Sequence, residues 1–332
     1  MKKLSVILVL LFIGAFVFAN GQGENSGAKG PITLRVTNTL TMDHPMNMAL
    51  KQFADGVTER TEGQVAVELF PNSQLGGNEE MVEGVQLGTI DMCNQFAGAF
   101  ANYVPEMEVL ALAFLFQSED HLYTALNGKA GDILADALLK KGFMPLGYFY
   151  GGSRSLMNNV RPVNSPVDLN GLKIRTIPTN ITLEGINRMG AIATPMSQAD
   201  VYSALEQGVL DGWENSPITL YTLKLHEVTK YVSLTRHFMT PDLFAISAKT
   251  WGKLSEDHKK IIVEEAKKAV EYERSIWAEN TQQAMTALKA EGVEFNDVAD
   301  LDAFRKATSS LWEEYEEKYN NGLIEAVLSA AK

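Results

Sequence analysis

The sequence predicts an α/β fold in two lobes, and three observations support this prediction. Short strands with alternating polar and apolar residues are separated by helical patterns from Ile32 onward, which is typical of a mostly parallel sheet covered on both faces. The same succession of patterns returns in the second half of the chain. A long helical pattern over 255–290 contains neither proline nor glycine, and it exceeds the span of one small domain.

The beginning of the chain has the pattern of a secretory signal peptide. Two lysines precede an apolar run that extends to Phe18, and a small-residue cleavage site ends at Ala19. Because the run is too short for a membrane span, we expect residues 1–19 to be removed. Residues 20–30, rich in Gly and Asn, are expected to form a disordered leader. No cysteine follows the cleavage site directly, so the predicted product is a periplasmic protein without a lipid anchor.

The composition excludes several classes of function. The formal net charge is -12 at pH 7, which disfavours nucleic acid and anionic membranes as partners. A small anionic ligand would therefore need a local basic pocket. Cys93 is the only cysteine, and its strand pattern indicates a buried structural thiol. The five histidines are scattered and form no ligand cluster, so the sequence predicts neither a metal nor a cofactor.

The first half of the chain alternates between strands and helices. Pro45 suits the first position of a helix that Asp43 or His44 can cap, so His44 follows the first strand. Ligands of parallel sheets bind beyond the carboxyl ends of the strands. His44 lies in such a loop and is therefore a candidate site residue. Strands are predicted at 32–37, 64–69 and 90–95, and helices at about 45–57, 77–87 and 118–140.

The second half contains one permanently charged donor in an otherwise apolar short strand. Residues 172–177 alternate in polarity, Arg175 shares a face with Ile177, and Pro178 ends the strand. A guanidinium offers planar, paired N–H donors that match a carboxylate and stay protonated at neutral pH. Arg175 is therefore a candidate anion-binding residue. The alternative is that Arg175 lies at a solvated sheet edge.

Three further residues of this half are candidates. Gly151 and Gly152 fit a segment in which the chain crosses between lobes, and Arg154 follows them. Like Arg175, Arg154 is either an anion-binding residue or an arginine at a solvated sheet edge. Near the end of a strand at 210–215, Asn215 could offer an amide to a bound polar group. Trp213 could form a flat apolar wall for a ligand, or it could be a core residue.

The helix expected over 255–290 would extend roughly 54 Å. We expect it to lie across both lobes as a shared spine, because the alternative of a solvated coiled-coil arm requires sustained heptads that the sequence lacks.

Catalytic motifs are missing from the sequence. The segment His226–Lys230 begins like a zinc-protease helix but lacks the second histidine, and Gly151–Ser155 lacks the final glycine of a nucleophile elbow. No Walker A loop is present, and no dinucleotide fingerprint follows the first strand. The sequence therefore predicts a protein that is not an enzyme.

The chain resembles the solute-binding proteins of tripartite ATP-independent periplasmic (TRAP) transporters, of the DctP type. The resemblance covers nearly all of the mature chain. It rests on the order and spacing of four segments, which are 69–77 (LFPNSQLGG), 152–154 (GSR), 168–175 (DLNGLKIR) and 190–215.

The resemblance implies a two-lobed periplasmic binding protein fold, type II-like, with hinge strands and a long helix spanning both lobes. Lobe I would comprise 31–151 plus about 241–280, and lobe II would comprise 152–240 plus about 281–332.

The resemblance also implies a function and roles for residues. Arg175 would hold a ligand carboxylate, with Arg154 and Asn215 assisting, and groups near His44 and Phe96 would complete the site from the other lobe. Trp213 stands where many relatives have glutamine. The protein would deliver the acid to the small and large membrane subunits of the permease.

The segment 84–91 (GVQLGTID) is similar to members that handle sugar acids, which favours a sugar acid over a C4-dicarboxylate. Two other classes stay open: a binding protein of an ABC importer or sensor system, and a secreted hydrolase. A monomer is expected, because no long coiled-coil seam is present.

Overall fold

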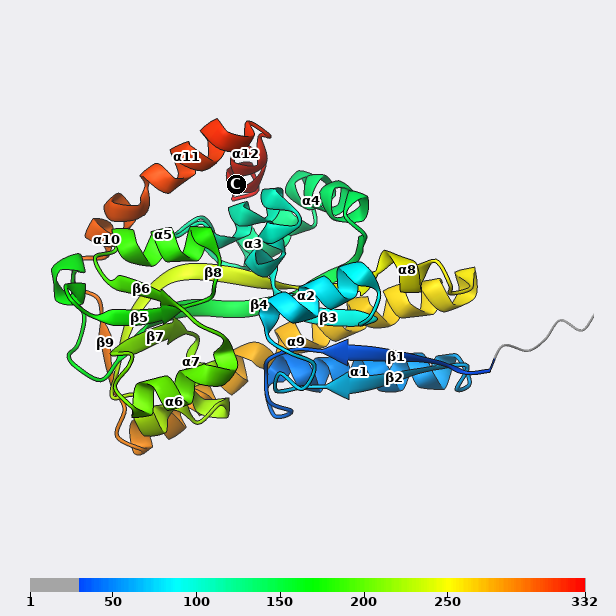
Figure 1. Ribbon diagram of the computed structural model, residues 1–332, viewed down its shortest axis with the longest axis horizontal. Helices are drawn as coiled ribbons and strands as arrows, with labels where there is room; N and C mark the ends of the chain where they lie inside the picture. Colours follow the sequence, from blue (N-terminus) through cyan, green and yellow to red (C-terminus); the bar gives the residue numbers. More distant parts are fainter. Residues whose placement is uncertain (1–29, 332) are drawn as a thin grey trace, which may run out of the picture. The chain divides into compact units, whose positions relative to one another are not determined.

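A computed structural model describes residues 30–331 of the chain (Figure 1). The predicted signal peptide, and all of the predicted leader except its last residue, lie outside the described residues. Within the described part, no helix is both long and apolar enough to cross a membrane.

Strands of the described chain form one sheet in the order β2-β1-β3-β8-β4-β7-β5-β6, with β9 beside β8. Strand β1 pairs in parallel with β2 and β3, and β5 pairs in parallel with β7 and β6. Strands β4 and β8 are antiparallel to each other and join the two parallel groups. The bounds are β1 Ile32–Thr37, β2 Val65–Phe70, β3 Met92–Phe96, β4 Phe143–Asn158, β5 Lys173–Thr176, β6 Ile192–Pro195, β7 Gly212–Asn215, β8 Tyr231–Ser247 and β9 Glu294–Asp297.

Helices surround this sheet (Figure 1). The α-helices are α1 Pro45–Arg60, α2 Asn78–Leu87, α3 Glu119–Leu126, α4 Lys129–Lys140, α5 Asn180–Arg188, α6 Val201–Glu206, α7 Pro217–Thr222, α8 Ala248–Trp251, α9 Glu256–Ala290, α10 Leu301–Thr308, α11 Ser310–Tyr319 and α12 Leu323–Ser329. Short 3-10 helices are η1 Ala97–Asn102, η2 Pro105–Ala111, η3 Pro166–Leu169, η4 Gln198–Asp200 and η5 Leu225–Val228.

The single helix predicted over 118–140 is wrong, because the segment forms two helices. Asn127 ends α3, and Gly128 is extended (φ -120°, ψ -152°) as the N-cap of α4. The first helix begins where expected, since the Ser118 side chain accepts a hydrogen bond from the His121 N–H at 3.1 Å. The helical spacing of apolar residues continues across the break, so the pattern alone conceals it.

Strands β4 and β8 carry the chain from one parallel group to the other. Their register shifts between Tyr150 and Ser153, where the glycine pair predicted as a crossing point lies. Gly152 has φ +79°, and a Cβ atom there would lie 2.7 Å from the Trp277 side chain and 3.1 Å from Ser216. Only glycine fits this position without displacing the long helix behind it.

Substituting Gly152 by alanine should lower the free energy of unfolding by about 2 to 5 kcal/mol, because backbone strain adds to the clash with Trp277. Gly171→Ala is the matched control: Gly171 has the same φ of +79°, and its Cβ would have nothing within 4 Å. The control should lose only the strain, about 1 to 2 kcal/mol. Urea unfolding of both variants measures the difference, and equal losses would contradict the steric argument.

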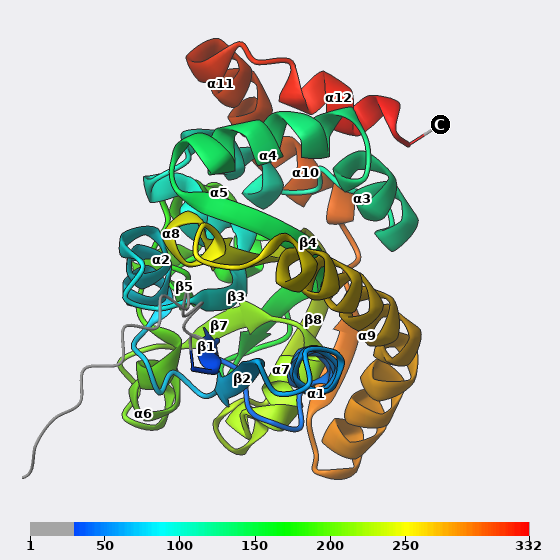
Figure 2. The ribbon, with the colours of Figure 1, turned by 90° about the vertical axis from the view of Figure 1, so that its right-hand side faces the viewer.

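Helix α9 is the predicted spine. Its N-cap, Ser255, accepts a hydrogen bond from the His258 N–H at 3.2 Å, and the helix packs against α1, β4 and α7. Arg60 of α1 donates to Glu265 of α9 at 2.8 Å. Figure 2 shows α9 beside α1, with the later part of the helix continuing beyond α1 toward the lower edge of the view. The helix therefore spans both lobes, which confirms the spine and excludes the solvated arm.

The last helix of the chain packs against helices from its first half. Helix α12 packs against α3 and α4, and its Leu323 and Val327 are buried in the same hydrophobic core as α1 and β3. Helix α10 instead packs against α5. The packing of α12 therefore favours lobe I for the last helix, whereas the sequence predicts lobe II for all of 281–332.

Candidate ligand-binding site

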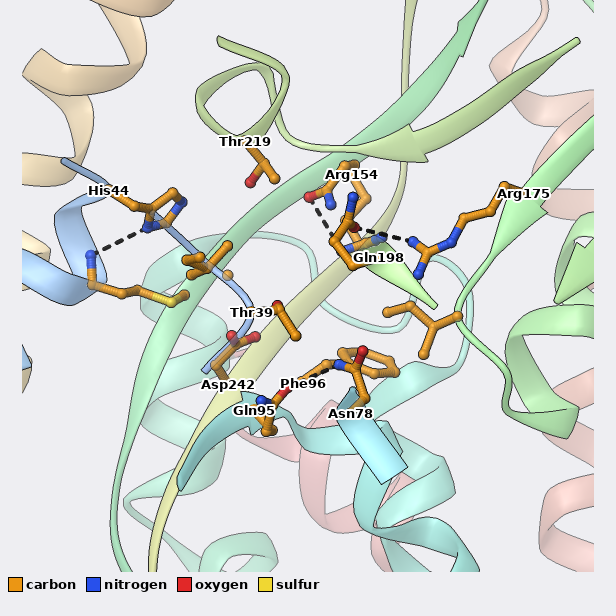
Figure 3. Close-up of a pocket in the computed structure, with 15 residues that line it drawn as sticks. Thr39, His44, Asn78, Gln95, Phe96, Arg154, Arg175, Gln198, Thr219 and Asp242 are labelled. Carbon is orange, nitrogen blue, oxygen red and sulfur yellow. Dashed lines mark hydrogen bonds between the residues drawn. The ribbon is translucent and has the colours of Figure 1, made fainter. Parts of the chain in front are cut away.

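A cavity lies where the two parallel groups of strands meet (Figure 3). Most of its lining comes from the carboxyl ends of strands, or from the loops and helix starts that follow them, as expected for a sheet of this type. Strands β4 and β8 form its floor. The lining residues are Thr39, Leu40, His44, Met46, Asn78, Gln95, Phe96, Gly151, Arg154, Arg175, Ile177, Gln198, Asn215, Thr219 and Asp242.

Arg175 of β5 contributes a cation that forms no ion pair with any carboxylate of the described residues. Its side chain is only 1% exposed, because β5 lies between β7 and β6 rather than at the sheet edge. Nε donates to the Met196 carbonyl at 2.8 Å and Nη1 to Gln198 Oε1 at 3.2 Å. Nη2 is buried and has no hydrogen-bond partner among the described residues. The solvated-edge interpretation is therefore excluded.

Burial lowers the pKa of Arg175 to about 10, partly opposed by the charge of Glu214. The guanidinium therefore stays protonated at neutral pH. A buried charge with an unused donor is costly, and a carboxylate that enters the cavity would remove that cost.

Arg154 of β4 also lines the cavity, but its charge is already paired. Nε donates to Glu214 Oε2 at 2.6 Å and Nη2 to Glu214 Oε1 at 2.8 Å, the bidentate geometry of a strong pair. Burial alone would raise the pKa of Glu214, but the charge of Arg154, with hydrogen bonds from His237 and Arg154, lowers it to about 2. Arg154 therefore brings donors to the cavity without a net charge.

The amide of Asn215 is oriented by its neighbours. Its Oδ1 accepts from Arg154 Nη1 at 3.2 Å and from the Ser216 N–H at 2.8 Å. These two contacts occupy the oxygen, so the amide nitrogen is left to donate to an acceptor in the cavity. Arg154 thus positions Asn215, and both lie near Arg175.

His44 lies on the opposite side of the cavity as the N-cap of α1. Its Nδ1 accepts from the Met46 N–H at 3.3 Å, which assigns the proton to Nε2. Burial lowers the pKa of His44 to about 3, although Asp43 opposes this shift. Nε2 is buried without a partner among the described residues. His44 is therefore a neutral donor rather than a second cation.

The same side carries Phe96 and several polar residues that the sequence analysis missed. Asn78 donates to Gln95 Oε1 at 2.8 Å, beside Thr39 and Phe96 (Figure 3). Thr39 and Gln95 lie near the ends of predicted strands, and this position could have identified them as candidate site residues. Asp242 lies within β8, opposite Phe96 of β3 and Phe149 of β4, and only the pairing of long strands brings it to the cavity. Gln198 and Thr219 complete the missed set.

Trp213 does not line the cavity, so its predicted role as a ligand wall is wrong in this structure. It lies two residues before Asn215 on β7, further from the carboxyl end of the strand. Its side chain is fully buried in a cluster that includes Val201 and Leu205 of α6. The core interpretation, which the sequence left open, is the correct one.

Among residues 30–331, no group of three or more His, Cys, Asp or Glu side chains could hold a metal ion. The only cysteine, Cys93, is buried in β3, as predicted.

Two α/β lobes around a polar cavity at strand ends define the class of solute-binding proteins. The chain belongs to the bacterial extracellular solute-binding protein family 7, DctP, which it matches over residues 36–318. This family consists of binding proteins, so the receptor interpretation is confirmed and the hydrolase is not favoured. Its description as extracellular agrees with the predicted export.

Three relatives are informative. The 2,3-diketo-L-gulonate-binding periplasmic protein YiaO of Escherichia coli is 35% identical over 309 residues, which cover 93% of this chain and 91% of that protein. A TRAP periplasmic solute-binding protein of Chromohalobacter salexigens with bound D-glucuronate is 33% identical, with a TM-score of 0.87, 90% coverage of this chain and 99% of the other. The sugar acid binding protein DctPAm of Advenella mimigardefordensis, in complex with galactonate, is 29% identical, with a TM-score of 0.88 and coverage of 91% and 98%.

These similarities confirm the predicted resemblance to TRAP solute-binding proteins and the two-lobed fold.

Proposed function

We propose that this protein is the periplasmic receptor of a TRAP transporter and that it binds a sugar acid, an aldonate or a uronate, through the carboxylate. The observation that carries the proposal is the buried guanidinium of Arg175, which keeps one nitrogen without a partner among the described residues. The bound acids of the relatives from Chromohalobacter and Advenella support a sugar acid over a C4-dicarboxylate.

In this proposal the groups of the cavity divide into two sets. Arg175 binds the carboxylate in a forked geometry. The Asn215 amide and Nη1 of Arg154, whose charge Glu214 compensates, add further donors. His44 Nε2 and the Asn78–Gln95 pair on the other side bind hydroxyl groups, while Phe96 packs on the carbon skeleton. A sugar acid offers both a carboxylate and hydroxyls, whereas a short dicarboxylate would leave the second set unpaired.

Binding is coupled to hinge closure because the two sets come from different lobes. A ligand shifts the population toward the closed form only through contacts that the closed form completes. We place the lobe boundary at Gly151–Gly152 of β4 and near Pro241 of β8, with α12 assigned to lobe I. The receptor then delivers the acid to the small and large permease subunits. It acts as a monomer, after cleavage of its signal peptide near Ala19.

The test is a thermal-shift screen of the chain from about residue 20 onward. D-glucuronate, galactonate, 2,3-diketo-L-gulonate, succinate and glucose represent the competing ligand classes. A sugar acid at 100 times its dissociation constant should stabilise the protein by about 2.7 kcal/mol, while glucose should have no effect. A response to succinate alone would favour the C4-dicarboxylate, and a response to glucose would contradict the role of Arg175.

A further inference from the structure

Asp242 is an acidic residue of the cavity with no partner of its own. It is partly exposed, and no hydrogen bond or ion pair within residues 30–331 engages its carboxylate. The nearby Glu214 contrasts with it, because Arg154 holds both of its carboxylate oxygens. A Cβ atom on Gly151 would lie 3.0 Å from Asp242 Oδ1. The glycine therefore avoids a steric contact with this carboxylate beside the floor of the cavity.

The charges of the cavity are arranged asymmetrically. Arg154 and Glu214 neutralise each other, and His44 is neutral. Arg175 and Asp242 are therefore the two charges left, and they lie on opposite sides of the cavity (Figure 3). One side of the cavity attracts a carboxylate, and the other side repels it.

We infer that Asp242 makes the site selective for acids with a single carboxylate. Arg175 holds that carboxylate, and the Asp242 oxygens accept hydrogen bonds from hydroxyls at the far end of the same molecule. A second carboxylate at that end would face Asp242 at close range, and such like-charge pairs are strongly unfavourable when desolvated. The inference rests on the proposed function and narrows it to aldonates and uronates, excluding aldarates.

The protonation of Asp242 provides a second, independent test of this selectivity, through its pH dependence. Although Asp242 is partly exposed, the residues around it keep most water away from its carboxyl group and raise its pKa to about 7, while Arg154 of β4 opposes the shift. Glu273 of α9 also faces this region, and burial raises its carboxyl pKa well above the usual value; His44 beside α1 stays neutral. Asp242 therefore gains charge as the pH rises through about 7, and selectivity should rise with it.

The test compares two acids with the same carbon skeleton by isothermal titration calorimetry at pH 8. Galactonate has one carboxylate, and galactarate carries a second one in place of the terminal CH2OH. The wild type should bind galactonate at least about 100-fold more tightly, and Asp242→Asn should reduce this preference at least tenfold. Asp43→Asn is the matched control, because the exposed Asp43 lies beside His44 but outside the cavity lining, and it should keep the preference.

The same titrations at pH 5.5 need no variant, so they decide the question even if Asp242→Asn fails to fold. The wild-type preference should fall at least threefold from pH 8 to pH 5.5, because Asp242 becomes protonated while the ligand carboxylates remain ionised. Equal affinity of the wild type for both acids at pH 8, or a preference unchanged by both the substitution and the pH, would overturn the inference. Failure of the wild type to bind any sugar acid would instead contradict the proposed function, and the inference with it.

Discussion

Replacing Arg175 by alanine should weaken the binding of a sugar acid by roughly 30-fold to several thousand-fold. The change leaves a desolvated carboxylate without its charged partner, which costs about 2 to 5 kcal/mol. Arg175→Lys should also bind poorly. A lysine keeps the charge but cannot reproduce the fork that reaches Met196, Gln198 and the ligand together. Isothermal titration calorimetry of both variants with galactonate measures the losses.

The unliganded Arg175→Ala protein should keep its stability, which separates a binding role from a structural one. The buried guanidinium has no counter-ion among the described residues and leaves one nitrogen unused, so removing its charge should cost the free protein little despite the loss of two hydrogen bonds. Lys173→Ala is the control, because Lys173 is an exposed residue of the same short strand and should bind as the wild type does. A loss of affinity under threefold in Arg175→Ala would contradict the assignment.

Much of the fold could be predicted because its signals are local. The Ser255 cap and the long run without proline or glycine define α9 almost to the residue, and Pro45 after His44 marks the start of α1. Alternation identified β5 and placed Arg175 on the same face as Ile177. Whether this strand lies at an edge depends on its neighbours, and only the strand order, with β5 between β7 and β6, answers that question.

The rest of the site depends on pairings between distant segments. Nothing near Arg154 indicates that Glu214 neutralises it, because the contact follows from the antiparallel register of β4 and β7. The predicted role of Trp213 was wrong because strand alternation puts Trp213 on the same face as Asn215. Alternation does not reveal that α6 covers Trp213 and leaves Asn215 at the cavity. Asp242 has no local motif at all. Charge compensation in a cavity is therefore a tertiary property that sequence patterns do not contain.

The Arg154–Glu214 pair leads to the second large prediction, on stability. Glu214→Ala should lower the free energy of unfolding of the unliganded protein by about 3 to 5 kcal/mol, because it leaves Arg154 buried without its counter-ion. Glu314→Ala is the control, since Glu314 forms a similar two-pronged pair with Arg188 but is half exposed, and it should change stability far less. Urea unfolding monitored by circular dichroism gives both values.

The pH dependence of the stability difference between the wild type and Glu214→Ala tests this prediction further. The pKa of Glu214 is about 2 in the folded protein against an ordinary value of 4.5, so the folded state favours the ionised form. A depressed folded pKa contributes stability that is fully present above about pH 4.5 and is lost as the pH falls toward 2. The gap between wild type and Glu214→Ala should therefore be constant from pH 8 to pH 5 and narrow below that. A loss under about 1 kcal/mol at pH 7, or a gap that widens in acid, would show that Arg154 finds another counter-ion and that the cavity is not neutralised as described.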